Sequence, residues 1–284
     1  MKQLWLIEND ASGSASRERS DAVRAFCTAE DRVLLGVTIF PKETLPAPGD
    51  LDARNVDTVV VFAGDGTANA AAVKLADWGG ELLVLPGGTM NMLSERLHGE
   101  KDFDTLLQRA GGRAGEASRV PCVRIGNHCA YVAVIAGPAA AWVHVREAVR
   151  EGRWRRLRRA VGFAWTLTFS RTVRVSTGAQ PQERGRAVNI LPPEQPDGEL
   201  EIEIYRFNGV VGALIAAFAW LSHSMGAQRH RGTSHARNAR LTGRGRIHLL
   251  VDGEEHHENA PLRAEADCRP LRFRRLTIDE GPSE

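Results

Sequence analysis

The most telling stretch of this chain is Asp57-Thr58-Val59-Val60-Val61-Phe62, followed directly by Ala63-Gly64-Asp65-Gly66-Thr67. The β-branched apolar run predicts a buried strand, and residues 68–78 predict a helix. A turn of small residues between them leaves backbone N–H groups at the helix start, where these donors and the helix dipole attract phosphate. Asp65 is unusual there, because a carboxylate repels phosphate unless it holds Mg²⁺ or handles a proton. The stretch therefore indicates phosphoryl-transfer chemistry.

Around this stretch, the first part of the chain alternates expected strands and helices. The strands are expected over residues 3–8, 32–40, 57–62 and 81–85, the helices over 17–29, 68–78, 90–97 and 102–109, and a loop over 41–48. This alternation predicts an α/β, Rossmann-like domain with a mostly parallel sheet. Ligands gather at the carboxyl ends of such strands, and three loops rich in small and polar residues follow expected strands, over residues 9–16, 63–67 and 86–91.

The second part of the chain has a different pattern. After a Gly/Ala-rich linker over residues 111–118, short strands separated by turns are expected over 119–125, 130–135, 164–176, 199–207 and 246–251. This pattern predicts a β-sandwich domain, interrupted by a helical insert near residues 142–159. We therefore expect domains over residues 1–118 and 119–268, and the segment 269–284 could return to the first domain.

Composition sets broader limits. The 284 residues carry a formal net charge of only +2, but arginine crowds residues 146–186 and 228–246. This crowding indicates either an anionic partner or a mere preference for arginine over lysine. The four cysteines show no metal-site spacing, and the apolar runs 131–145 and 210–221 fall short of the about 18–20 residues that cross a bilayer. We expect a cytoplasmic protein that could attach to the inner membrane surface.

Several motifs together resemble the diacylglycerol kinase catalytic family, which includes soluble bacterial lipid kinases and the sphingosine and ceramide kinases. They are Asn9-Asp10-Ala11-Ser12-Gly13, Ala63 to Thr67 with Asn69, Pro86-Gly87-Gly88-Thr89-Met90-Asn91, Pro196-Asp197-Gly198 and Asp252-Gly253-Glu254. The resemblance implies an ATP- and Mg²⁺-dependent lipid kinase that phosphorylates a hydroxyl of diacylglycerol or of a sphingoid- or ceramide-type lipid. It also implies an active site in the cleft between two domains and a lipid substrate presented at a membrane surface. No nucleic-acid partner is expected, and the oligomeric state stays open.

The resemblance also assigns roles to single residues. Glu254 would act as the general base, with Asp252 and Asp65 ordering Mg²⁺ and water, and Asp197 would bind a structural Mg²⁺. The residues expected to bind ATP are Asn9, Ser12, Gly13, Thr38, Ala63, Gly64, Asp65, Gly66, Thr67, Asn69, Thr89 and Asn91. Short hydroxyls and bare backbone donors suit a charged, oxygen-rich ligand.

Plainer interpretations stay open beside these roles. Asp252-Gly253 is also a strong hairpin signal, although on an extended segment Asp252 and Glu254 would share a face. Pro196-Asp197-Gly198 is a good β-turn without any metal, and each glycine-rich loop could be a simple chain reversal. Adjacent His256 and His257 point opposite ways on a strand, so they are not expected to share a metal ion.

The chain departs from the family pattern at several positions. Ala63 stands where the family has glycine, which costs roughly 1–2 kcal/mol if the position needs a positive φ and nothing if it does not. Met90 replaces another glycine, and Gly87 replaces a bulkier residue. An NAD kinase shares the Gly-Asp-Gly-Thr loop, but its Asn-Glu pair is missing because His128 follows Asn127. A catalytically weak module that binds lipid or nucleotide is the remaining alternative function. The basic segment 151–165 is open to two interpretations as well, a contact with a membrane or a solvated helix face.

Overall fold

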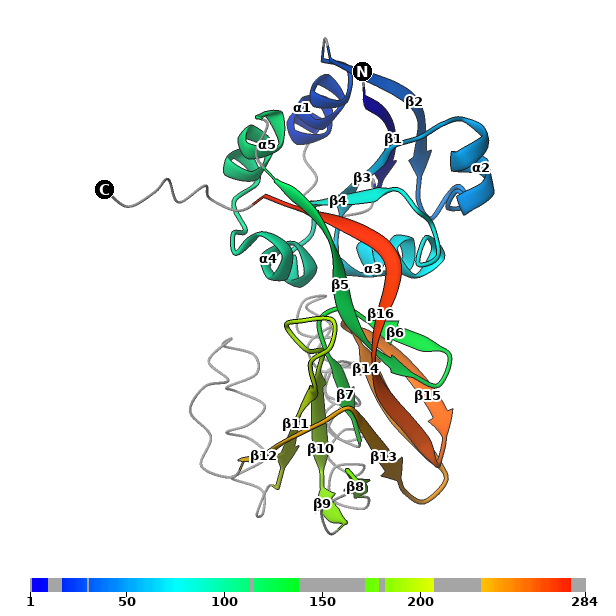
Figure 1. Ribbon diagram of the computed structural model, residues 1–284, viewed down its shortest axis with the longest axis vertical. Coiled ribbons are helices and arrows are strands. Elements are labelled where there is room, and N and C mark those ends of the chain that lie inside the picture. Colours follow the sequence, from blue (N-terminus) through cyan, green and yellow to red (C-terminus); the bar gives the residue numbers. More distant parts are fainter. Residues whose placement is uncertain are drawn as a thin grey trace, which may run out of the picture. The chain divides into compact units, whose positions relative to one another are not determined.

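The computed structural model describes residues 2–9, 17–29, 31–112, 115–137, 172–178, 182–206 and 231–276. The chain forms two compact units, which Figure 1 shows as two groups of elements. Unit 1 comprises Met1–Val120 with Cys268–Glu284, and unit 2 comprises Pro121–Asp267. The boundaries thus lie within two residues of the expected ones, and the chain returns to unit 1 at its C-terminal end.

Unit 1 is built on a parallel sheet in the strand order β2-β1-β3-β4-β16. Its strands are β1 (Lys2–Glu8), β2 (Arg32–Ile39), β3 (Thr58–Ala63), β4 (Glu81–Pro86) and the far end of β16 (Leu262–Arg275). β16 joins through Arg272 and Phe273, which pair with Glu81 and Leu82 of β4. The predicted α/β domain with a parallel sheet is therefore confirmed.

Five helices connect and cover these strands within the described part of unit 1: α1 (Arg17–Cys27), α2 (Pro48–Ala53), α3 (Asp65–Lys74), α4 (Met92–His98) and α5 (Phe103–Gly111). Helices α1 and α5 pack on one sheet face in a core that contains Leu6, Val60, Phe62, Leu83 and Leu85. The sequence did not predict α2, because its six residues bury only Leu51 and show no apolar period. Helix α3 begins at Asp65, three residues earlier than expected.

Unit 2 contains two sheets of mostly antiparallel strands. One has the order β12-β11-β10-β7-β14-β15, with β12 (Arg231–Ala236), β11 (Leu200–Tyr205), β10 (Ala187–Leu191), β7 (Val134–Ala136), β14 (Arg246–Val251) and β15 (Glu254–Asn259). The other uses β5 (Glu116–Ile125), β6 (His128–Ala130), β8 (Val173–Ser176), β9 (Glu183–Gly185), β13 (Asn238–Thr242) and the near end of β16. Apolar residues of both sheets share one core, so the predicted β-sandwich is confirmed.

One expected strand of unit 2, over residues 130–135, is wrong. The structure has β6 ending at Ala130 and β7 starting at Val134. Between them, the backbone N–H groups of Tyr131, Val132 and Ala133 donate to the carboxylate of Asp252 instead of to a neighbouring strand. The side chain of Asp252, about 120 residues away in sequence, thus interrupts the strand, and the local sequence pattern does not predict this interruption.

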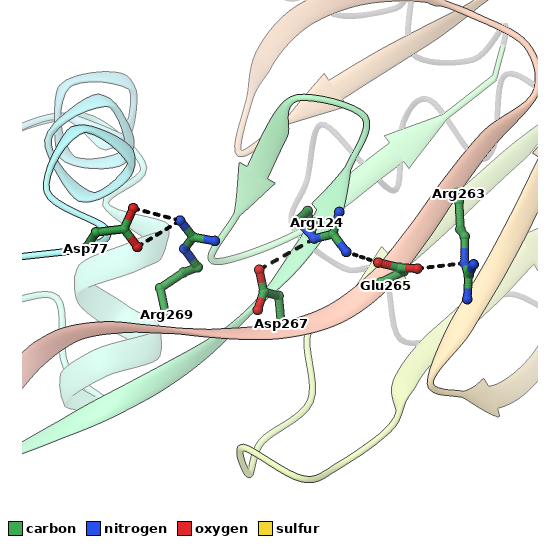
Figure 2. Close-up of polar contacts among 6 residues, drawn as sticks. All are labelled: Asp77, Arg124, Arg263, Glu265, Asp267 and Arg269. Atoms are coloured by element: carbon green, nitrogen blue, oxygen red, sulfur yellow. Dashed lines mark hydrogen bonds and ion pairs between the residues drawn. The ribbon is translucent and has the colours of Figure 1, made fainter.

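Exposed ion pairs accompany β16 in both units (Figure 2). In unit 2, Arg124 of β5 pairs with Glu265 and with Asp267, and the latter contact is 3.6 Å long. Glu265 also pairs with Arg263 at 2.6 Å. In unit 1, one guanidinium nitrogen of Arg269 donates to both carboxylate oxygens of Asp77, at 2.9 and 3.0 Å. Because the arginines are solvent-accessible, each pair contributes about 0–1 kcal/mol, and the apolar cores dominate stability.

The helical insert expected near residues 142–159 and the basic segment 151–165 lie outside the described residues. Among the described helices, none combines the length and apolar character needed to span a membrane.

Candidate active site

Two glycine loops meet at the carboxyl ends of β3 and β4. The last residues of the two strands, Ala63 and Pro86, pair with each other, and the N–H of Gly87 donates to the carbonyl of Ala63 at 3.0 Å. A Cβ atom on Gly88 would lie 2.5 Å from the Cα of Gly64, and one on Gly87 would lie 2.7 Å from the backbone nitrogen of Ala63. Glycine is therefore required at 87 and 88, because only a bare backbone allows the loops to approach this closely.

The start of α3 forms the first loop. Gly64 is its N-cap in an extended conformation, and no side chain caps the helix. Gly64, Asp65 and Gly66 are half-buried, whereas Thr89 of the neighbouring loop is exposed. A helix start built from small residues suits an anion, because its backbone donors and dipole face the same way.

Side chains fix the second loop from two directions. Asn91, at a left-handed φ of 50°, accepts from the N–H of Gly88 at 2.7 Å and donates to the carbonyl of the same residue at 2.8 Å. Asp65 accepts from the N–H of Leu93 at 3.0 Å, at the start of α4. Asp65 thus joins the starts of α3 and α4 and helps to order both loops.

The conformation of Ala63 shows whether this position needs the positive φ that would strain an alanine. Ala63 is the last residue of β3, is buried and lies outside the positive-φ residues of the described chain. Alanine at this position therefore carries no strain from a left-handed backbone. The close approach of the loops falls on Gly64, Gly87 and Gly88 instead.

Three further residues expected to bind ATP, Asn9, Thr38 and Asn69, lie in the described part of unit 1. Asn9, directly after β1, donates to the hydroxyl of Thr67 at 2.9 Å. Asn69 is buried in α3, and its side-chain oxygen has no hydrogen-bond partner among the described residues. Thr38 is buried too, and its hydroxyl accepts from the indole of Trp5 at 3.0 Å, which gives it a structural contact within the sheet. Ser12 and Gly13 lie outside the described residues.

A hollow of about 630 Å³ lies beside Asn9 within unit 1. Its wall includes residues of β1 and α1 and the segment after β2: Glu8, Asn9, Arg17, Ser20, Asp21, Arg24, Ile39, Lys42, Glu43 and Phe62. Buried Glu8 accepts from Ser20 and from Nε of Arg24 at 3.1 Å, and its hydrogen bond raises the pKa of the Arg24 guanidinium. The sequence did not single out Arg17, Arg24 and Lys42, because they come from a helix and a loop without a motif.

In unit 2, Asp252 and Gly253 form the two-residue turn of the β14–β15 hairpin. Both have positive φ, at 46° and 92°, and Val251 pairs with Glu254 across the turn. The hairpin interpretation is therefore confirmed, and the extended segment on which Asp252 and Glu254 would share a face is wrong. Asp252 is only 3% exposed and accepts at 2.7–2.9 Å from the three N–H groups of residues 131–133. Both carboxylate oxygens of Asp252 thus accept hydrogen bonds that fix the backbone of residues 131–133.

Glu254 begins β15, and its side chain is exposed. Partial burial of its carboxyl nevertheless raises the pKa of Glu254 above the usual value. A raised carboxyl pKa moves a glutamate toward the range in which it can accept a proton at neutral pH.

Asp197 lies in a β-turn closed by the N–H of Gly198 and the carbonyl of Gln195 at 3.0 Å. Its side chain is 104% exposed, and Arg237 approaches one carboxylate oxygen at 3.9 Å. The turn thus exists as expected, whereas the predicted metal role of Asp197 stays a prediction. In the described residues, the cluster of potential metal ligands lies elsewhere, at His248, Glu255 and His257.

Known proteins are similar to this chain in part of its sequence and in its fold. Residues 3–124 match the model of the diacylglycerol kinase catalytic domain. No curated protein matched the chain in sequence. The crystal structure of a diacylglycerol kinase from Bacillus anthracis str. Sterne has a similar fold, at 14% identity, with 96% of each chain covered and a TM-score of 0.63. A structure described as a proposed diacylglycerol kinase from the same organism is similar at 15% identity, with 96% of each chain covered and a TM-score of 0.64. Residues 3–124 are thus similar to the catalytic domain of the diacylglycerol kinases, which are a family of kinases.

Proposed function

We propose that this protein is a lipid kinase that transfers the γ-phosphoryl group of MgATP to a hydroxyl of diacylglycerol or of a sphingoid- or ceramide-type lipid. One observation carries the proposal: the two glycine loops at the ends of β3 and β4 lie inside the residues that match the kinase domain. Their backbone contact is so close that side chains at Gly87 and Gly88 are excluded. Such a loop pair beside a helix start is the kind of backbone that holds phosphate.

The residues of unit 1 would bind and orient the nucleotide. The start of α3, from Gly64 to Gly66, would hold phosphate oxygens through backbone N–H groups. Buried Asn69 could contribute its side-chain oxygen to ordering water near the loop. The hollow beside Asn9, with Arg17 and Lys42 in its wall, would take another part of the nucleotide.

Glu254 would act as the general base on the acceptor. Its carboxylate takes the proton of the lipid hydroxyl while the hydroxyl oxygen forms a bond to the γ-phosphorus and the bond to ADP breaks. The raised pKa of Glu254 supports this role, because it increases the proton affinity of the base. Positioning and charge neutralisation supply most of the rate in this class of reaction.

The acidic residues fit Mg²⁺ unequally. Asp65 accepts a hydrogen bond from the backbone N–H of Leu93 and lies at the helix start expected to hold phosphate, so it suits a magnesium ion that arrives with ATP. Asp252 is less suited to be a direct ligand, because it is only 3% exposed and both of its oxygens already accept backbone N–H groups. We therefore assign Asp252 a structural role in the hairpin, and Mg²⁺ enters as part of the donor substrate.

The proposal is tested by incubating the protein with labelled MgATP and a panel of lipids in mixed micelles and in anionic vesicles. Label on a lipid is the expected result, and Glu254→Gln should lower the rate about 100-fold or more. Glu194→Gln is the matched control, because Glu194 is an exposed glutamate of the same unit. Higher turnover on vesicles than in micelles would support an acceptor presented at a membrane surface.

A second pair of variants examines the nucleotide loops. Asp65→Asn keeps an acceptor for the N–H of Leu93 and removes the charge, so the fold persists while transfer slows. Asp104→Asn is the control, because Asp104 also lies in the first turn of a helix. Label on NAD instead of lipid, or nucleotide binding without any transfer, would contradict the proposal.

A further inference from the structure

The β14–β15 hairpin carries three histidines and three glutamates near one another, and the sheet sorts most of them onto two faces. Ile247, Leu249 and Val251 of β14 belong to the core of unit 2, so His248 lies on the other face of that strand. His257 pairs directly with His248 across the two strands, and Glu255 lies two residues before His257. His248, Glu255 and His257 therefore share the face away from the core.

The ligand atoms of these three residues all lie within 4.8 Å of one another. Nδ1 of His248 is 3.8 Å from Oε1 of Glu255, and Nε2 of His257 is 3.6 Å from the same oxygen. In a tetrahedral zinc site with bonds of about 2.0–2.1 Å, neighbouring ligand atoms are roughly 3.3–3.5 Å apart. The three groups thus stand close to the spacing of a bound ion without any rearrangement of the strands.

We propose that His248, Glu255 and His257 bind a divalent transition metal ion of the zinc class. Two imidazole nitrogens and one carboxylate oxygen form a donor set that suits zinc better than Mg²⁺, which prefers oxygen ligands alone. His248 is buried, Glu255 is half-buried and His257 is exposed, so solvent or a further ligand reaches the ion from the side of His257. The site does not rest on the kinase reaction, and the ion would join edge strand β15 to β14.

The opposite face of β15 provides a control built into the same strand. There His256 stacks on His128 of β6, with ring centroids 4.1 Å apart, and His128 contacts Glu258 through Nε2 at 2.8 Å. This second group also contains two histidines and a glutamate. It does not meet the spacing that His248, Glu255 and His257 meet in the described chain. Replacing His257 should therefore weaken metal binding, whereas replacing its sequence neighbour His256 should not.

The test uses protein without a histidine tag, treated with a chelator and then titrated with Zn²⁺ against a chromophoric competitor. We expect one tight zinc equivalent per chain and a higher unfolding temperature with zinc. His257→Ala and His248→Ala should each weaken zinc binding about 100-fold or more, while His256→Ala leaves it unchanged. Because His257 is exposed, His257→Ala retains the fold, which circular dichroism checks. With Co²⁺ the wild-type protein should show the visible absorption of a four-coordinate site, and His257→Ala should lose it.

The proposal is overturned by any of three results. These are no zinc binding tighter than that of free histidine peptides, zinc binding that survives His257→Ala, and equal losses in His256→Ala and His257→Ala. Lipid kinase activity of the metal-free protein is a separate measurement, so loss of the zinc site and failure of the kinase proposal can be told apart.

Discussion

The glycine loops of unit 1 and the β14–β15 hairpin of unit 2 both contain an aspartate followed by a glycine, and both units also require glycine at particular positions, but for different reasons. At positions 87 and 88 of unit 1, glycine is needed because another backbone lies where a Cβ atom would be. At Gly253 in unit 2, the need comes from the backbone itself, since φ is 92°. The aspartates differ as well, because Asp65 accepts from the N–H of Leu93 at a helix start, whereas Asp252 accepts from the N–H groups of residues 131–133. An aspartate followed by a glycine can therefore begin a helix in one unit and form a buried hairpin turn in another.

Removing the carboxylate of Asp252 should have the largest effect on the free energy of unfolding among the variants that test this comparison. Asp252→Ala leaves the N–H groups of residues 131–133 without their acceptor, and hydrogen bonds to a charged group are individually strong. We expect a loss of about 3–5 kcal/mol in the free energy of unfolding. Urea denaturation followed by circular dichroism measures it.

Asp197→Ala is the matched control for that experiment, because Asp197 also precedes a glycine in a turn of unit 2. Its side chain is fully exposed, so the expected change stays within about 0.5 kcal/mol. Equal losses in Asp197→Ala and Asp252→Ala would show that the turn, and not the buried carboxylate, is what stabilises the hairpin.

Gly88→Ala tests the close approach of the two glycine loops in unit 1. The new Cβ atom would meet the Cα of Gly64 at 2.5 Å, and neither backbone can move without shifting a loop. We expect a loss of about 1–3 kcal/mol in the free energy of unfolding, together with weaker nucleotide binding. Gly79→Ala is the control, because nothing lies within 4 Å of a Cβ atom there. Thermal unfolding and nucleotide titration give the two readouts, and a Gly88→Ala variant as stable as Gly79→Ala would refute the close contact.

The smallest expected effect is a pH dependence in unit 1. Buried His98 contacts the carbonyl of Val84 at 2.8 Å through Nε2, and the N–H of Leu276 donates to its Nδ1 at 3.1 Å. Nδ1 must therefore be unprotonated, and burial lowers the pKa of His98 below its usual value. Between that lowered pKa and about 6.5, the unfolded chain binds a proton that the folded chain does not, so stability falls as the pH falls.

Urea unfolding between pH 5 and 8 measures this slope in three proteins. His98→Gln should flatten it, whereas His235→Gln should leave it unchanged, because the side chain of His235 is exposed. A slope that persists in His98→Gln would assign the pH dependence to other groups.

The two units also differed in how far the sequence predicted them. In unit 1 the strand, turn and helix around Asp65 are contiguous, so apolar period and turn residues predicted them directly. The hollow beside Asn9 was not predicted, because Arg17 and Lys42 contribute to it from separate elements. The zinc-class cluster was missed for a similar reason, since it needs His248 of one strand opposite His257 of the next. The sequence alone did argue correctly that His256 and His257 face opposite ways.

The sheet of unit 1 is completed by the end of the chain, and this order matters for the chain as it is being made. β3 and β4 emerge early, but the strand that covers the outer edge of β4 follows the 147 residues of Pro121–Asp267. At about 5–20 residues per second, translation of that stretch takes roughly 7–30 seconds. During this interval the nascent chain presents an uncovered strand edge, whose unpaired N–H and C=O groups can pair with another chain and so favour aggregation. Unit 2 is thus synthesised as an insertion within unit 1, before the last strand of the unit 1 sheet has been made.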